Sequence, residues 1–226
     1  RSAWGVSEDE VVMATMAEPL RWADARVAAD LVGRVAVAGR RVRLLVHPAA
    51  ERRVEAHRWM RHLGIESLLL VDDEAAEPWR VLPGVDAAWI PGGDPSGRMA
   101  VVGSSASPDR WGIRGLLLGG DRRHRPAPSV LPMLWAMAAG RPVIAEAHGG
   151  SMWILGAEDA AAAGRLIPPG DVSRAAEALA RLHDDRDAAA AAGRQGRRVV
   201  DGRYHISGFC VRLRDAWVRL VEDRPV

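Results

Sequence analysis

Several residue types are absent or scarce in this sequence of 226 residues. It contains no Lys and no Asn, and only one Thr, one Tyr, one Phe and one Cys. The single Cys210 excludes an internal disulfide and a zinc site built on cysteines, and the lack of Asn excludes N-glycosylation sequons. Apolar runs fall far short of the ~20 residues that cross a membrane, and no signal peptide opens the sequence. We therefore expect a globular, cytoplasmic protein with no transmembrane segment.

The absence of Lys also changes how the charge is interpreted. The 31 basic residues are all Arg, and they exceed the 29 acidic residues by only two, yet the isoelectric point is about 9.4. Without Lys almost nothing titrates between neutral pH and the Arg range, so a small Arg excess raises the isoelectric point. No nucleic-acid partner is expected. The bias against residues with AT-rich codons indicates a GC-rich bacterial genome, and the first residue, Arg1 rather than Met, suggests a piece of a longer protein.

Short apolar runs alternate with amphipathic stretches along most of the chain. The expected strands cover residues 10–17, 43–47, 67–71, 87–90, 142–145 and 165–167. The expected helices cover residues 22–38, 51–63, 130–139 and 171–183, followed by two C-terminal helices within 186–223. Apolar strands joined by helices predict a parallel sheet covered on both faces. The sequence thus predicts one α/β domain over 1–226, with a doubly wound, Rossmann-like sheet that binds ligands at the carboxyl ends of its strands.

The segment 92–128 interrupts this alternation. It is rich in Gly, Pro, Ser and Arg, and so long a loop without secondary structure is uncommon in a compact domain. Two interpretations stay open, a surface insertion or a basic lid over an anionic ligand. The arginines of such a lid would be Arg110, Arg114, Arg122, Arg123 and Arg125.

Common local motifs of catalysis and metal binding are missing from the sequence. There is no GxGxxG after the first expected strand, no P-loop, no HExxH and no GxSxG. His57 and His62 share one expected helix, but their spacing of five does not suit metal ligands on one helix face. We therefore expect no bound metal.

The most specific pattern lies between residues 131 and 171. It consists of LPMLWAMAAGRPVIAEAHGG and, further on, GRLIPPGDVSRAAEALARL. In order and spacing it resembles the C-terminal domain of the retaining GT-B glycosyltransferases of group 1. The shared landmarks are Leu131, Pro132, Ala136, Met137, Ala138, Gly140, Pro142, Val143, Gly149, Gly150, Gly164 and residues 168–171. The resemblance covers nearly the whole chain except 92–128, and it implies that this domain corresponds to the C-terminal half of a GT-B fold.

The resemblance also implies a substrate and a site. The family uses a nucleotide sugar of the UDP or GDP type as substrate, needs no cofactor for this, and transfers a hexose with retention to an acceptor held by an N-terminal domain, which this sequence lacks. A helix that begins at 130–131 directs N–H groups and its dipole at the diphosphate, and the Gly-Gly pair allows close backbone approach, although both features also simply form turns. The residues expected at the donor crevice are Glu18, Arg21, His47, Leu131, Pro132, Gly149 and Gly150.

The catalytic signature of the family is replaced in this sequence. The family places an Arg and a Lys after the first strand, where this chain has Glu18 and Ala23, and two Glu around the Leu-Pro, where it has Ala127 and Trp135. A carboxylate beside a diphosphate is repelled, and the loss of two cations removes leaving-group stabilisation. Enzymatic activity therefore stays open. One hypothesis is an active glycosyltransferase, the second a degenerate, non-catalytic domain that serves as a binding or assembly module (a pseudoenzyme), and a third, weaker one another sugar-nucleotide enzyme such as an epimerase.

The last expected helix, about 206–221, has an apolar side. In the family this helix crosses back onto the N-terminal domain. In this chain its apolar side is expected to pack locally, or to form a homodimer contact.

Overall fold

The computed structural model describes residues 1–16, 25–48, 50, 53–72, 78–92 and 130–222. Within these residues a six-stranded sheet has the order β3-β2-β1-β4-β5-β6, and all neighbouring strands are parallel. The strands are β1 (Val11–Thr15), β2 (Val42–Val46), β3 (Leu69–Val71), β4 (Ala87–Ile90), β5 (Val143–Glu146) and β6 (Gly164–Ile167). The predicted parallel sheet is confirmed, and its strand order reverses between β1 and β4, as in doubly wound folds.

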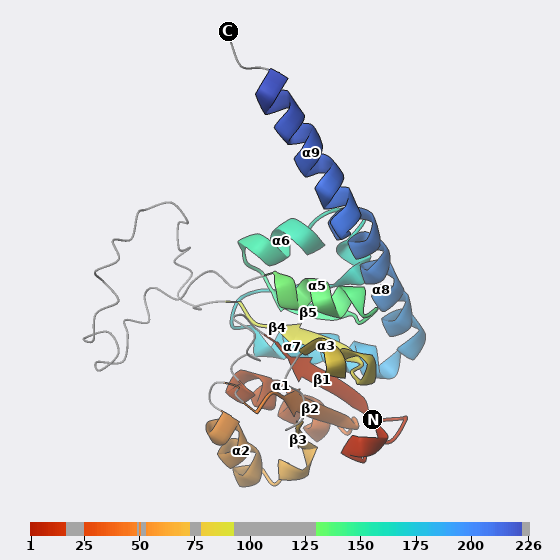
Figure 1. Ribbon diagram of the computed structural model, residues 1–226. Coiled ribbons are helices and arrows are strands. Elements are labelled where there is room, and N and C mark those ends of the chain that lie inside the picture. Colours follow the sequence, from red (N-terminus) through yellow and green to blue (C-terminus); the bar gives the residue numbers. More distant parts are fainter. Residues whose placement is uncertain (17–24, 49, 51–52, 73–77, 93–129, 223–226) are drawn as a thin grey trace, which may run out of the picture.

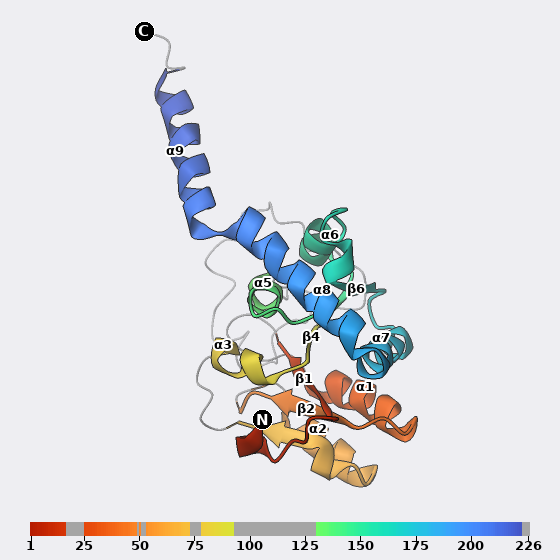
Figure 2. The ribbon, with the colours of Figure 1, turned by 90° about the vertical axis from the view of Figure 1, so that its right-hand side faces the viewer.

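Helices cover both faces of this sheet (Figures 1 and 2). The helices are α1 (Ala25–Val37), α2 (Arg53–His62), α3 (Pro78–Val81), α5 (Leu131–Ala138), α6 (Gly149–Leu155), α7 (Val172–Asp184), α8 (Arg186–Val199) and α9 (Ile206–Glu222). On one face α1 packs between α2 and α7, and on the other α5 lies on β4 and β5 and contacts α8. Every residue of β1, β4 and β5 is buried, as expected for strands covered on both sides.

Local signals place most helix ends correctly. α1, α2 and α5 are each followed by a glycine with positive φ, namely Gly39, Gly64 and Gly140, as predicted from the C-terminal glycine signal. The helix α6 was not predicted. Gly149 and Gly150, expected to form a turn, are its first two residues. The predicted segment 92–128 lies outside the described residues apart from Gly92.

The helix α9 extends away from the body of the domain (Figures 1 and 2), and its main contacts are with the preceding turn, Val200–Tyr204. The prediction that its apolar side packs locally is wrong, because these side chains are exposed. They are Ile206, Phe209, Val211, Leu213, Trp217, Val218, Leu220 and Val221. None of the helices in the described part of the chain combines the length and the apolar character that a membrane span requires.

Candidate functional site

The carboxyl edge of β1 and β4 is where a doubly wound sheet binds its ligands. Thr15 ends β1, and its register partner Trp89 is the residue before the last in β4, so their side chains lie on the same face of the sheet. Both are buried, yet neither Thr15 Oγ1 nor Trp89 Nε1 has a hydrogen-bond partner in the described structure. A buried polar group without a partner costs about 1–3 kcal/mol. Such groups require an explanation. Here both lie at the carboxyl edge between β1 and β4, where the strand order reverses and a ligand is expected.

Glu146, the last residue of β5, brings a buried carboxylate to this edge, with only 7% of the residue exposed. Its Oε2 accepts a 2.5 Å hydrogen bond from Gly92 N, and its Oε1 accepts a 2.9 Å bond from Gly170 N. Burial raises the pKa of the Glu146 carboxyl above its usual value, and the two backbone hydrogen bonds oppose that shift. Sequence reasoning missed Glu146. The available signal was an acidic residue at the end of an otherwise apolar strand, VIAE.

His148 follows β5 and caps the N-terminus of α6. His148 N donates to Ser151 Oγ at 2.9 Å, Ser151 N donates to His148 Nδ1 at 3.4 Å, and Ser151 Oγ donates to Glu146 O at 2.6 Å. Because Nδ1 accepts, the ring proton lies on Nε2, which is buried and has no partner in the described structure. Burial lowers the pKa of the His148 imidazole, so the ring is neutral at physiological pH. His148 is thus an uncharged N–H donor.

The two glycines after His148 occupy different surroundings. A Cβ added at Gly149 would meet no atom within 4 Å, whereas one at Gly150 would lie 2.4 Å from Val130 Cγ1. Gly150 therefore permits α6 to pack against the residue that precedes α5. Only Gly149 opens onto free space, so it is the better candidate for close approach by a ligand.

The start of α5 agrees with the sequence prediction. The helix begins at Leu131, which is 47% exposed, while Pro132 is buried and contributes to the core rather than to an open surface. Val130, the residue before the helix, makes no side-chain hydrogen bond to cap it. Trp135 is half-buried and lies one helical turn after Leu131, on the same side of α5.

The remaining predicted residues divide into two groups. His47 directly follows β2 and is half-buried at the same carboxyl edge. Glu18, Arg21, Ala23 and Ala127 lie outside the described residues, and so do the arginines of the predicted lid. The structure thus brings His47, Leu131 and Gly149 to one edge of the sheet, and it adds Glu146 and His148.

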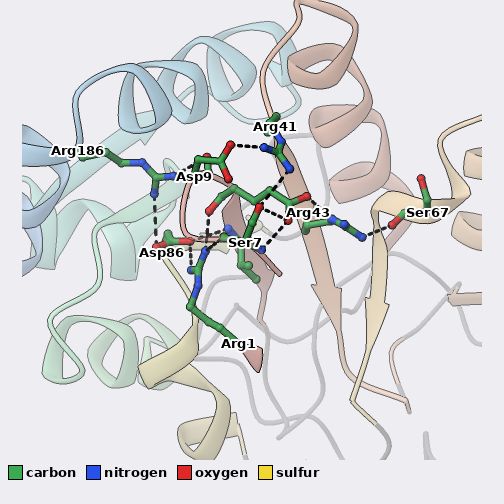
Figure 3. Close-up of polar contacts among 10 residues, drawn as sticks. Arg1, Ser7, Asp9, Arg41, Arg43, Ser67, Asp86 and Arg186 are labelled. Atoms are coloured by element: carbon green, nitrogen blue, oxygen red, sulfur yellow. Dashed lines mark hydrogen bonds and ion pairs between the residues drawn. The ribbon is translucent and has the colours of Figure 1, made fainter. Parts of the chain in front are cut away.

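The opposite, amino edge carries a dense charged network instead (Figure 3). Asp86 Oδ2 accepts hydrogen bonds from Val12 N at 2.8 Å and from Arg1 Nη1 at 2.6 Å. Arg186 lies 3.5 Å from Asp86 Oδ1 and links α8 to the same carboxylate. Arg41 pairs with Asp9 beside them. These groups pair with one another, so the network holds the amino ends of the strands together.

A groove of about 1140 Å³ lies over β5 and β6 between α7 and α8. Alanines and arginines form much of its wall, and none of the predicted site residues lines it. Among the described residues no three His, Cys, Asp or Glu side chains gather as metal ligands. Within the described part of the chain, the carboxyl edge therefore remains the candidate site.

Solved structures of similar fold match almost the whole chain. HepE from Anabaena, solved in complex with UDP and glucose, is 16% identical, and the match covers 97% of this chain and 51% of HepE with a TM-score of 0.69. TarM from S. aureus, solved with ligands that include UDP, is 13% identical, with coverage of 95% and 36% and a TM-score of 0.63. The chain has the fold of a GT-B glycosyltransferase domain.

One of the similar structures is itself a single GT-B domain. It is the C-terminal domain of the group-1 glycosyl transferase LpcC from Francisella tularensis, 16% identical, and the match covers 87% of this chain and 86% of that domain with a TM-score of 0.57. No family model matches the sequence, and no curated protein matches it. The chain spans about half the length of HepE. At the level of the fold, the resemblance predicted from the sequence is confirmed.

Proposed function

We propose that this GT-B domain is the nucleotide-sugar-binding half of a group-1-like glycosyltransferase, whose full-length protein transfers a hexose with retention. The observation that carries the proposal is the match over 97% of the chain to HepE, which was solved with UDP and glucose and also with UDP-glucose. The donor is then a UDP or GDP sugar, and it lies at the carboxyl edge between α5 and α6. No cofactor takes part.

The described residues suit such a donor. The N-terminus of α5 places the positive end of a helix dipole at this edge, where a diphosphate is stabilised. The open space at Gly149 allows backbone approach. The Nε2–H of His148, the residue before Gly149, is an uncharged donor that is buried and has no partner in the described structure, so a ligand must displace neighbouring atoms to reach it. His47 extends the site toward β2, and Arg21, which follows β1 in the sequence, is the cation that we propose for the diphosphate. In this arrangement His148 takes up part of the phosphate binding for which the family uses charged side chains.

We propose an N-terminal acceptor domain as the partner of this chain. Eight large apolar side chains of α9 are exposed, and the chain spans about half of HepE. A large exposed apolar surface is typical of an interface. The apolar side of α9 then packs against the acceptor domain, and a homodimer through the same helix is the alternative. Cys210 is free and exposed, in keeping with a reducing, cytoplasmic location.

A non-catalytic GT-B domain is the second candidate. Trp135 stands where the family has the carboxylate that grips the ribose, and an indole offers no acceptor for hydroxyl groups. Glu18, Ala23 and Ala127 replace the other three functional side chains. A domain with these replacements still binds a partner or a nucleotide through its fold, but it lacks the groups that stabilise a leaving diphosphate.

Calorimetry of the chain with UDP, GDP and their sugars tests donor binding. We expect a dissociation constant below about 1 mM for one of these nucleotides, weakened by Arg21→Ala. No heat with any of them would overturn the donor site. A turnover assay of the full-length protein with the sugar nucleotide that binds separates the two candidates, because the non-catalytic domain binds without releasing free nucleotide.

A further inference from the structure

The carboxylate of Glu146 lies between Gly92 and Gly170, which belong to the connections after the two strands on either side of β5. Gly92 follows β4, and Gly170 precedes α7 in the connection from β6. The N–H of Gly92 donates to one carboxylate oxygen at 2.5 Å, and the N–H of Gly170 donates to the other at 2.9 Å. One side chain at the end of the central strand therefore joins the residue two positions after β4 to the residue two positions before α7.

These two N–H groups form the kind of cradle that binds an oxyanion. Backbone N–H groups that converge on one point bind carboxylates and phosphates, and hydrogen bonds to an ionised acceptor are the strong ones. Within the described residues no Arg or His pairs with Glu146, so the two N–H groups are its charge-stabilising partners. The anion in this cradle belongs to the protein itself.

The backbone at both donors is specialised for close approach. A Cβ at Gly92 would lie 2.8 Å from Glu146 Oε2 and 2.9 Å from Glu146 Cβ, so no side chain fits there while the carboxylate is in place. Gly170 has a φ of +77°, a conformation that residues with a side chain rarely adopt. The backbone at residues 92 and 170 therefore allows both N–H groups to approach the Glu146 carboxylate closely.

We propose that Gly92 N and Gly170 N form an oxyanion-binding site that Glu146 occupies internally, and that this occupancy positions Gly92 after β4 and Gly170 before α7 at the carboxyl edge. Glu146 is thus a positioning residue. Its ligand class is a small carboxylate or another oxyanion, which enters only when the side chain is removed. In the wild-type chain these two N–H groups are engaged by Glu146, so a bound nucleotide is held by other donors. The proposal goes beyond nucleotide binding and does not depend on it.

The test follows the amide hydrogen exchange of Gly92 and Gly170 by NMR in the full 226-residue chain. In Glu146→Ala we expect both amides to exchange about tenfold faster or more, because both lose their acceptor. Added formate restores protection at both positions, since it supplies the missing carboxylate. In Glu146→Gln we expect only one amide to lose protection, because the side-chain amide keeps one acceptor oxygen and turns an NH₂ group toward the other N–H.

Glu10→Ala is the matched control. Glu10 is an equally buried glutamate, 5% exposed, at the opposite edge of the sheet, where Arg43 is its partner. Its removal should leave the exchange of Gly92 and Gly170 unchanged, and sodium chloride at equal ionic strength should not replace formate. Unchanged exchange in both Glu146 variants would overturn the proposal, and so would equal protection by chloride. If the Ala variant does not fold, the Gln variant decides. Failure to bind nucleotide would affect none of these readouts.

Discussion

Glu10 and Glu146 are buried glutamates at opposite edges of one sheet, and their pKa values are shifted in opposite directions. Burial alone would raise the pKa of Glu10, but hydrogen bonds from Arg43 and from Ser7 hold it at about 2. Among the described residues the partners of the Glu146 carboxylate are two backbone N–H groups, and burial raises its pKa. At the amino edge, side-chain and backbone partners stabilise the charge of Glu10. At the carboxyl edge, the charge of Glu146 has two backbone N–H groups as partners among the described residues. The same contrast separates a structural edge from a candidate site.

Glu10→Gln should destabilise the protein relative to wild type, and the loss should be larger at neutral pH than at acid pH. A carboxyl whose pKa is lowered on folding stabilises the folded state above its unfolded value, and that stability is lost as pH falls through the folded value. We expect a loss of about 1–3 kcal/mol in the free energy of unfolding at neutral pH, which shrinks between about pH 5 and pH 2. Urea unfolding followed by Trp fluorescence measures this. A difference that stays constant over that range would contradict it.

Glu146→Gln should show the opposite pH dependence. A carboxyl whose pKa is raised on folding contributes stability that is fully present below its unfolded value and is lost as pH rises through the folded value. The stability of the wild-type chain relative to the variant then falls as the pH rises and Glu146 ionises. The same urea series on both Gln variants checks the sign. Parallel pH profiles for the two variants would show that their environments do not differ as described.

Gly150→Ala should destabilise the fold, while Gly149→Ala should not. The new Cβ at residue 150 would lie 2.4 Å from Val130 Cγ1, and overpacking of this kind costs about 1–3 kcal/mol. At residue 149 the Cβ enters open space, and Ala favours a helix over Gly. We expect Gly149→Ala to weaken UDP or GDP binding in calorimetry while its thermal unfolding stays at or above that of wild type.

Gly202→Ala provides the control for that pair. A Cβ at residue 202 also meets no atom within 4 Å, and Gly202 lies in the turn between α8 and α9, which contains none of the candidate site residues. It should change neither stability nor nucleotide affinity. Equal effects of the variants at 149 and 202 on nucleotide affinity would argue against a ligand at α6.

Replacement of apolar residues on α9 should matter only in the full-length protein. Trp217 and Leu220 are each 68% exposed, so a Trp217→Ser, Leu220→Ser variant of this chain should change in stability by less than about 0.5 kcal/mol per site. In the full-length protein the same variant should unfold at a lower temperature, because the proposed acceptor domain packs against these two side chains. Ultracentrifugation of the chain tests the homodimer alternative, which predicts a dimer that the variant converts to a monomer.

Apart from α6, the sequence alone determined most of the strand and helix pattern. The buried strands β1, β4 and β5 are continuous apolar runs, and α1 and α7 have the amphipathic period of a helix, so both signals lie in residues close together in the chain. It also indicated the helix ends, since a glycine with positive φ acts locally. The family pattern around α5 identified the correct fold, although HepE, TarM and LpcC are only 13–16% identical to this chain.

Only the tertiary structure decided the features that join distant residues. Glu146 is paired with Gly92 and Gly170, which lie 54 and 24 residues away in the sequence. The helix α6 begins with two glycines, which disfavour a helix, and it forms with the His148–Ser151 cap while Gly150 fits against Val130. The exposure of α9 depends on what packs against it rather than on its own sequence. These three features depend on which distant segments come together in the folded protein. The short-range pattern of apolar residues in the sequence does not contain that information.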